Sequence, residues 1–270
     1  MASYPTIQQL FDLTGKVFLV AGGAHNLGRD MAMALAEAGA NGVITSRNEN
    51  NAMATAKEIS EATGQKILGL SLDATMEDDV VRVFNSITQN LGEIDILVNS
   101  VGGGASQGAS TQFEEQPLNE WKLLHQTNLT ATYLLCKQAS SRMKKRGSGS
   151  IINVASIAGI IGRDRRVYPP EMSPQSVGYA SAKAGVIGLT MDLAAYLGPD
   201  GVRVNVISPG GFERGQPQSF IKAYSDKVPL RRMGRDGIDL KGVVLFLASE
   251  ASAYVTGHNL VVDGGFTICQ

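Results

Sequence analysis

Long hydrophobic runs, paired cysteines and a basic leader are all missing from this sequence of 270 residues. No window approaches the roughly 20 apolar residues that a membrane span needs. The first 16 residues show no basic stretch followed by an apolar one, so we expect no signal peptide. The two cysteines, Cys136 and Cys269, stand far apart in the sequence and outside any metal-ligand spacing. Such sparse use of cysteine is typical of a protein in a reducing compartment. We therefore expect a cytoplasmic protein without a metal site or a membrane anchor.

An excess of charge of one sign is missing too. The chain carries 24 Lys and Arg against 25 Asp and Glu, a formal net charge of -1. This balance gives no reason to expect nucleic acid or an anionic membrane as a partner. Internal repeats and low-complexity linkers are also lacking. Because single α/β domains commonly reach this length, we expect one domain over residues 1–270.

Short, continuous runs rich in Val, Ile and Leu recur along the chain, as in strands that are buried on both faces. The predicted strands are Val17–Val20, Gly42–Thr45, Ile67–Leu72, Ile94–Val98, Ile151–Val154, Val202–Val206 and Leu260–Val262. Helical periodicity separates them at Met31–Ala38, Asn51–Ala62, Glu77–Asn90, Leu118–Met143, Tyr179–Leu197 and Leu240–Ala248. This alternation predicts an α/β fold with a doubly wound sheet of about seven parallel strands and helices on both faces. Two long irregular stretches, about 157–177 and 208–237, predict a substrate loop and a lid.

A glycine-containing turn follows the first predicted strand and leads directly into a helix. It reads Ala21-Gly22-Gly23-Ala24-His25-Asn26-Leu27-Gly28. Glycine allows close backbone approach to a phosphate, and a helix N-terminus supplies N–H donors. This context favours a dinucleotide-binding turn over a merely tight strand–helix connection. Gly22, His25, Asn26, Leu27 and Gly28 are the candidate cofactor-binding residues.

The second predicted strand ends at Thr45-Ser46-Arg47. An acidic residue here would bind the ribose hydroxyls, whereas a basic one accommodates a 2′-phosphate. With Ser46 and Arg47 at this place, and His25 able to assist when protonated, we expect NADP(H) to be preferred and NAD(H) to be possible. The alternative is that Arg47 is an ordinary solvated loop arginine.

Tyr179 and Lys183 stand four residues apart at the start of a strong helical pattern, so their side chains share one face. A phenol is a poor base at neutral pH, and a neighbouring ammonium lowers its pKa. Such a pair can exchange a proton with an alcohol or a ketone. An isolated pair of this kind is more often just an exposed helix pair, so other motifs must decide.

Further motifs make the sequence similar to the classical short-chain dehydrogenase/reductase family along almost its whole length. The turn at 21–28 resembles the family's phosphate turn, Asp73-Ala74 its adenine-contacting pair, and Asn99-Ser100-Val101-Gly102 the segment after its fourth strand. The family's catalytic residues are matched by Asn128, Ser156, Tyr179 and Lys183. Its nicotinamide-side loop is matched by Pro209-Gly210, with Phe212 following, and its C-terminal signature is matched by Val262-Asp263-Gly264-Gly265. The resemblance implies a Rossmann-type fold, an oxidoreductase acting on CH–OH groups with NAD(P), and a homotetramer.

The same resemblance assigns roles to the four catalytic positions. Tyr179 is expected to be the general acid and base, and Lys183 to bind the nicotinamide ribose and lower the pKa of the tyrosine. Ser156 is expected to hydrogen-bond the reacting oxygen, and Asn128 to hold a water in the proton relay. The cofactor supplies the chemistry, and the protein supplies position and electrostatics.

Several positions depart from the family's pattern. Ala21 stands in place of a threonine, and Asn26 in place of a glycine, although Asn tolerates a left-handed φ well. Ser100 and Val101 also differ, and the stretch after Pro209-Gly210 lacks the usual threonine against the cofactor. For Asn99, a cofactor role and a purely structural one are equally open, and for Asp263 we favour the structural one.

The segment between Ser156 and Tyr179 is longer than in the family, because the two residues are 179 − 156 = 23 positions apart. The additional residues include Arg163, Arg165 and Arg166. An arginine here is suited to bind a carboxylate, phosphate or sulfonate of the substrate. The alternative is a solvated insertion or a subunit contact.

These observations favour a sugar acid or polyol substrate, as in gluconate 5-dehydrogenase-like members. A 3-oxoacyl thioester, as in acyl-carrier-protein reductase-like members, is the alternative. A dinucleotide-sensing regulator without turnover is a third possibility, which Ala21, Asn26 and Ser100 favour and the four intact catalytic positions oppose. A purely structural protein fits least.

Overall fold

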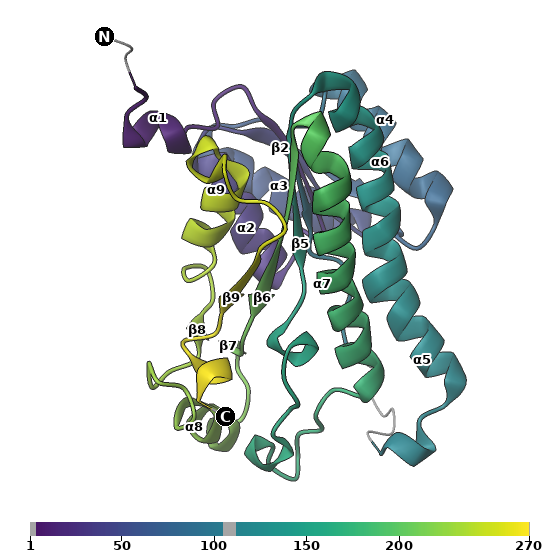
Figure 1. The fold of residues 1–270 in the computed structure, drawn as a ribbon, viewed down its shortest axis with the longest axis vertical. Coiled ribbons are helices and arrows are strands. Elements are labelled where there is room, and N and C mark those ends of the chain that lie inside the picture. The colour runs from purple at the N-terminus through teal and green to yellow at the C-terminus, as the bar shows by residue number, and fades with distance from the viewer. Residues whose placement is uncertain (1–3, 105–111, 270) are drawn as a thin grey trace.

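The computed structural model describes residues 4–104 and 112–269 and is built around one parallel sheet. The seven strands lie in the order β3-β2-β1-β4-β5-β6-β9, each parallel to its neighbour (Figure 1). They are β1 (Val17–Ala21), β2 (Asn41–Ser46), β3 (Ile67–Ser71), β4 (Ile96–Asn99), β5 (Gly149–Val154), β6 (Val202–Pro209) and β9 (Asn259–Val262). This confirms the predicted α/β class with seven parallel strands.

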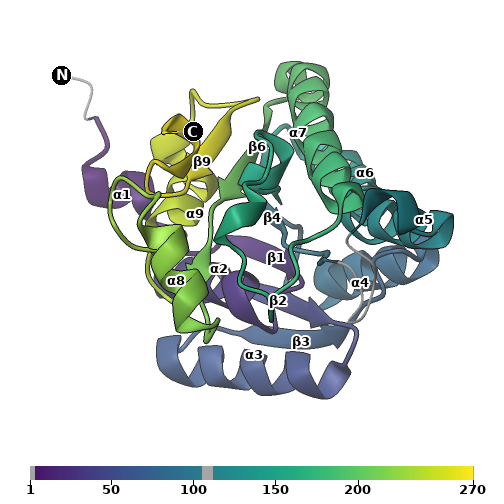
Figure 2. The ribbon, with the colours of Figure 1, turned by 90° about the horizontal axis from the view of Figure 1, so that it is seen from below.

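Helices cover both faces of the sheet because the strands are apolar on both sides. On one face, α2 (Asn26–Glu37), α3 (Glu49–Thr63) and α9 (Lys241–Ala248) contribute to one buried cluster. On the other, α4 (Glu77–Asn90), α6 (Ala131–Arg146) and α7 (Val177–Leu197) contribute to a second. Figure 2 shows α2 and α9 on one side of the strands and α5, α6 and α7 on the other.

The strand order reverses between β1 and β4, which are neighbours in the sheet although β2 and β3 separate them in the chain. In open parallel sheets, ligands bind outside the carboxyl ends of the strands at such a switch point. Ala21 at the end of β1 pairs with Asn99 at the end of β4. The turn that follows Ala21 and the segment that follows Asn99 therefore meet at one edge of the sheet.

The predicted helix Leu118–Met143 is not a regular α-helix. It consists of α5 (Leu118–His125), a π-helical turn over Gln126–Thr130 and α6. A π turn accommodates one extra residue per turn, and such turns are frequent at functional sites. Helical periodicity in the sequence does not separate this turn from the α-helices on either side.

The stretch 208–237, predicted to be irregular, contains ordered elements. The end of β6, a short pair of strands β7 (Phe212–Glu213) and β8 (Gly234–Arg235), and helix α8 (Gln218–Ser225) all lie in it. The short helix α1 (Ile7–Phe11) near the N-terminus was also not predicted. The stretch 157–177 holds only the 3-10 turns Ile157–Gly159 and Arg165–Val167 before α7 begins.

The inserted segment and α8 pack against each other. Val167 shares a buried cluster with Phe220 and Tyr224 of α8 and with Phe266 near the C-terminus. Asp164, whose side chain is nearly buried, is ion-paired to Lys227 just after α8. The predicted substrate loop and the predicted lid therefore form one packed unit beside the carboxyl ends of β5 and β6.

No helix among the described residues is both long and apolar enough to cross a bilayer. Within residues 4–104 and 112–269, no three His, Cys, Asp or Glu side chains gather in a way that could hold a metal ion.

Candidate active site

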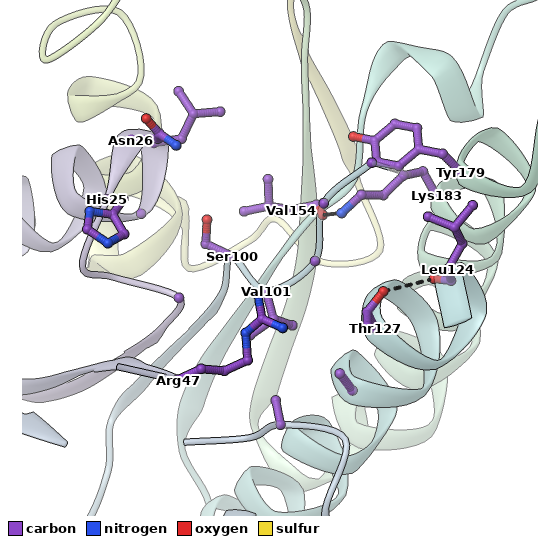
Figure 3. A pocket seen from close by; sticks show the side chains of 18 of the residues that line it. His25, Asn26, Arg47, Ser100, Val101, Leu124, Thr127, Val154, Tyr179 and Lys183 are labelled. Carbon is purple, nitrogen blue, oxygen red and sulfur yellow. Dashed lines mark hydrogen bonds between the residues drawn. The ribbon is translucent and has the colours of Figure 1, made fainter. Parts of the chain in front are cut away.

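A cavity of about 870 Å³ opens at the carboxyl ends of the central strands. Its walls come from the turn after β1, the ends of β2 and β5, the segments after β3, β4 and β6, and helices α5 and α7. Figure 3 shows Tyr179 and Lys183 on one side of this space and His25 and Asn26 on the other. Segments that are far apart in the sequence thus enclose one site.

The turn after β1 has the geometry of a phosphate-binding loop. Gly22 has a φ of +78°, and a Cβ at this position would lie 2.6 Å from the carbonyl oxygen of Ser100. Asn26 has a φ of 50°, the left-handed conformation expected of the residue that replaces a glycine. A Cβ on Gly28 would lie 2.1 Å from the carbonyl oxygen of Gly22. The loop is therefore packed as tightly as a backbone cradle for a phosphate requires, with the N-terminus of α2 behind it.

The residues predicted for the adenosine end line the same cavity. Ser46, Arg47, Asp73 and Ala74 all contribute to its wall. The Asp73 carboxylate accepts hydrogen bonds from the hydroxyl and the backbone N–H of Thr75, which lower its pKa, and the positive charge of Arg47 lowers it further. This end of the cavity therefore carries one fixed cation and one carboxylate that stays ionised.

His25 also lines the cavity at this end. Its Nε2 lies 3.2 Å from the side-chain nitrogen of Asn51 on α3.

Tyr179, Ser156 and Lys183 come together where β5 and α7 meet. The Ser156 hydroxyl hydrogen-bonds to the Tyr179 phenol and also accepts a hydrogen bond from the N–H of Ala158 at 3.1 Å. The Lys183 ammonium donates to the carbonyl oxygen of Val154 at 2.9 Å and lies 5.8 Å from the centre of the Tyr179 ring. All three side chains line the cavity.

Burial dominates the ionisation of this cluster. It raises the pKa of the Tyr179 phenol, while the hydrogen bond from Ser156 and the positive charge of Arg163 oppose that rise. Burial lowers the pKa of Lys183 to about 8. The groups that oppose the rise in the pKa of Tyr179 thus include Ser156 and Arg163, which the sequence did not predict for this effect.

Asn128 lies in the π-helical turn and is completely buried. Its side-chain nitrogen donates to the carbonyl oxygens of Leu124 and Gly103, and its side-chain oxygen accepts from the N–H of Gly103 at 3.2 Å. A Cβ on Gly102 would lie 2.2 Å from that oxygen, so only glycine fits there. Asn128 thus holds the backbone of residues 102–104, which line the cavity, without lining it itself.

Two predicted cofactor residues do not line the cavity. Asn99 is buried and donates to the side-chain oxygen of Asn153 at 2.7 Å. Phe212 is buried in the core cluster that includes α2 and α9. The Asp263 carboxylate accepts from the N–H groups of Gly265 and Thr267, which is the structural role favoured for it.

The three arginines of the insertion lie in different surroundings. Arg166 is ion-paired to Asp164, and its side chain is 85% exposed. Arg165 is exposed as well. Arg163 donates to the carbonyl oxygen of Gln175, and its charge acts on both Tyr168 and Tyr179. Of the three, Arg163 is therefore the one whose charge acts on Tyr179.

Sequence reasoning missed other residues of the cavity wall. One of them is Thr45, whose hydroxyl oxygen accepts a hydrogen bond from the N–H of Gly22 at 3.3 Å. Glu120, Leu123 and Leu124 reach the cavity from α5, and Arg214 reaches it from the stretch after β7. In the sequence, these residues were marked only by their proximity to a motif. Whether a side chain points into the cavity depends on the helix or turn that carries it, which the sequence does not show.

The chain was compared with known proteins. A family model described as enoyl-(acyl carrier protein) reductase matches residues 22–267. The 3-oxoacyl-(acyl-carrier-protein) reductase of Aquifex aeolicus is 34% identical over 257 residues, which cover 94% of this chain and 98% of the relative. That of Vibrio cholerae is 36% identical over 262 residues, with the same coverage.

Solved structures are similar over the whole chain as well. A short-chain type dehydrogenase/reductase from Mycobacterium marinum is 35% identical, with a TM-score of 0.85, covering 97% of this chain and 99% of that one. A gluconate 5-dehydrogenase from Burkholderia cenocepacia, solved in complex with NADP and tartrate, is 29% identical, with a TM-score of 0.87, covering 98% and 100%. The fold of this chain is therefore similar to that of proteins whose names give an activity.

Proposed function

Because the chain belongs to the short-chain dehydrogenase/reductase family, and is thus an oxidoreductase acting on carbonyl and hydroxyl groups, we propose that it reduces the ketone of a 3-oxoacyl thioester with NADPH. The observation that carries the reaction type is the hydrogen-bonded pair of Tyr179 and Ser156 beside the buried Lys183. These groups face the same cavity as the phosphate-binding turn. A proton donor and a place for a dinucleotide are thereby brought together.

The residues divide the work as follows. A nicotinamide bound in the cavity would supply the hydride for the carbonyl carbon. The Tyr179 phenol donates its proton to the carbonyl oxygen as charge develops there, and the Ser156 hydroxyl stabilises the phenolate that remains. Lys183, as a cation that lines the cavity, would hold the nicotinamide ribose. Asn128 keeps residues 102–104 in place along the cavity wall.

The proposed substrate class is not the one that the sequence favoured. Curated relatives that are 34–36% identical over 94% of the chain reduce 3-oxoacyl groups by name, which supports the thioester over the sugar acid. Leu123 and Leu124 of α5 add apolar side chains to the cavity, and Leu124 lies beside Gly178, the neighbour of Tyr179. Apolar surface there suits an acyl chain better than a polyol.

The test is a substrate panel with the purified protein. Acetoacetyl-coenzyme A, a neutral 3-oxo-ester of the same size and 5-oxogluconate are each assayed with NADPH and NADH. We expect acetoacetyl-coenzyme A to give a kcat/KM at least about tenfold above that of 5-oxogluconate, a difference of about 1.4 kcal/mol in transition-state binding. The reverse order would transfer the assignment to the sugar acids. Cofactor binding without turnover of any ketone would favour the sensing regulator.

A sugar acid substrate remains the second candidate, supported by two observations. Arg163 lies close enough to Tyr179 for its charge to act on the phenol, so an anionic group of a bound substrate is within its reach. A similar structure is a gluconate 5-dehydrogenase with bound tartrate, a dicarboxylate. For this candidate, Arg163→Ala would lower kcat/KM for an acid selectively over its neutral ester, whereas Arg166→Ala, at an exposed position, would not.

We also infer a preference for NADPH, a homotetramer and a cytoplasmic location. Arg47 at the adenosine end supports the first, and a solved relative contains NADP. Family resemblance supports the homotetramer, and the scarcity of cysteine supports the cytoplasmic location.

A further inference from the structure

The side chain of Arg214 has no role in the function described so far. It follows the strand β7 and reaches the wall of the main cavity. The basic side chains among the described lining residues are His25, Arg47, Lys183 and Arg214. His25 and Arg47 lie toward the adenosine end, and Lys183 lies under Tyr179. Arg214 is therefore the cationic side chain of this wall to which no role has been assigned at either end of the cavity.

Arg214 is held in place beside helix α2. Its Nε donates to the carboxylate of Asp236 at 2.7 Å. The next residue, Gly237, donates its N–H to Asp30 of α2, also at 2.7 Å. Asp30 is buried, and the positive charge of Arg214 helps to hold down its pKa against the effect of burial. These contacts place the guanidinium next to the first turns of α2, whose N-terminus is Asn26.

A fixed cation at this place matches the charge of a dinucleotide. The pyrophosphate carries two negative charges, and the turn at Gly22–Gly28 offers backbone N–H groups but contains no Lys or Arg side chain. A guanidinium has five N–H donors, and the contact to Asp236 uses the one on Nε. The planar end of the side chain suits a phosphate geometrically, as it does a carboxylate.

We propose that Arg214 is a cofactor-binding residue whose guanidinium binds the pyrophosphate of the dinucleotide opposite the N-terminus of α2. The inference depends on the family's cofactor class and not on the identity of the ketone. The competing explanation is structural: through Asp236, Arg214 merely joins the segment before α8 to the segment after β8.

The first experiment measures the dissociation constants of NADPH and NADH by fluorescence titration, without any ketone. Because both cofactors have the same pyrophosphate, Arg214→Ala is expected to weaken both by the same factor, roughly ten- to a hundredfold. Arg47→Ala serves as a comparison and is expected to weaken NADPH alone. The matched control is Arg235→Ala, which removes an arginine of the adjacent strand β8 that is paired to Asp239 and does not line the cavity.

The second experiment locates the contact on the ligand. ADP-ribose and AMP are titrated as competitors of NADH; only the first has a pyrophosphate. The proposal requires Arg214→Ala to reduce the preference for ADP-ribose over AMP, and Arg214→Lys to restore part of it.

Unchanged dissociation constants for NADPH and NADH in Arg214→Ala would overturn the proposal, as would an equal loss of affinity for AMP and ADP-ribose. If Arg214→Ala fails to fold, Arg214→Gln replaces it, because the glutamine amide can still donate to Asp236. A structural role alone predicts a lower melting temperature without ligand and normal affinity in the folded fraction. Binding measurements of this kind remain decisive even if the 3-oxoacyl thioester is not the substrate.

Discussion

At the scale of single residues, the ionisation of Tyr179 depends on opposing effects. Burial disfavours the phenolate, whereas the Ser156 hydroxyl and the Arg163 guanidinium favour it. Burial also disfavours the cationic form of Lys183, whose pKa of about 8 still leaves it mostly protonated at neutral pH. The inserted segment therefore does more than lengthen a loop, because it brings a positive charge toward the proton donor.

This arrangement predicts the pH dependence of an Arg163 variant. In the direction of alcohol oxidation, Tyr179 acts as a base, so kcat/KM rises with pH as the phenol deprotonates. Removing the guanidinium raises the pKa of Tyr179, so in Arg163→Ala the rise in kcat/KM moves to higher pH. The profile is measured from pH 6 to 10 with saturating cofactor. Arg166→Ala is the control, and coincident profiles for Arg163→Ala and the wild type would contradict the assignment.

Arg47 predicts the choice of cofactor. Its guanidinium lines the adenosine end of the cavity, and Ser46 beside it carries no charge to repel a 2′-phosphate. We expect the ratio of kcat/KM for NADPH over NADH to exceed one and to fall by roughly tenfold in Arg47→Ala. Lys57→Ala, an exposed change on the following helix, is expected to leave the ratio unchanged. Equal use of both cofactors by the wild type would refute the preference.

At the scale of elements, the short turn between β1 and α2 leaves no room for a side chain at Gly28. A Cβ on Gly28 would lie 2.1 Å from the carbonyl oxygen of Gly22, well inside any contact distance. Gly28→Ala therefore has to displace the turn, and we expect the affinity for NADPH to fall at least about tenfold. The measurement is a fluorescence titration with a melting curve to check folding.

The control for Gly28→Ala is Gly242→Ala in α9, where a Cβ meets nothing within 4 Å. It is expected to bind NADPH normally and to melt at or above the wild-type temperature, because alanine favours a helix. An affinity of Gly28→Ala within twofold of the wild type would mean that the turn does not approach the phosphates.

The regular elements could be predicted from the sequence because their burial is periodic. The strands from β1 to β9 of the main sheet are continuous apolar runs, and α4 begins and ends where its pattern does. The π turn at Gln126–Thr130 and helix α8 could not be predicted in this way. The first differs from an α-helix by one residue per turn, and the second is a helix of eight residues within a stretch rich in Gly and Pro.

The site could be predicted only in part, for a related reason. Some site residues belong to motifs whose spacing in the sequence already indicates how their side chains are arranged: Gly22, Ser156, Tyr179 and Lys183. Arg163 and Arg214 belong to no such motif, because the direction of their side chains is set by tertiary contacts with Gln175 and Asp236. Distinguishing Arg163 from Arg165 and Arg166 required the fold of the insertion.

At the scale of the whole molecule, the exposed faces of α6 and α7 bear on the oligomeric state. Tyr133, Met191 and Tyr196 are large apolar side chains on these helices, and they are 49%, 57% and 64% exposed. We propose that copies of this chain pair through these helices, as the family resemblance implies. We expect sedimentation at micromolar concentration to give a homotetramer, and Met191→Glu to shift it to smaller species. Met53→Glu on α3 is the control, and a wild-type monomer would contradict the expectation.

We propose above all that Tyr179 moves the proton in this nicotinamide-dependent oxidoreductase. The most direct test compares turnover and cofactor binding in Tyr179→Phe, with Tyr168→Phe, a half-buried tyrosine of the insertion, as the control. Turnover is followed as NADPH oxidation with the best ketone of the panel, and binding by fluorescence titration. We expect Tyr179→Phe to lose at least about 100-fold in kcat, since general acid–base groups contribute 10²–10⁴-fold. Its dissociation constant for NADPH is expected to stay within about threefold of the wild-type value. A Tyr179→Phe variant that keeps more than about a tenth of the wild-type rate would contradict the proposal.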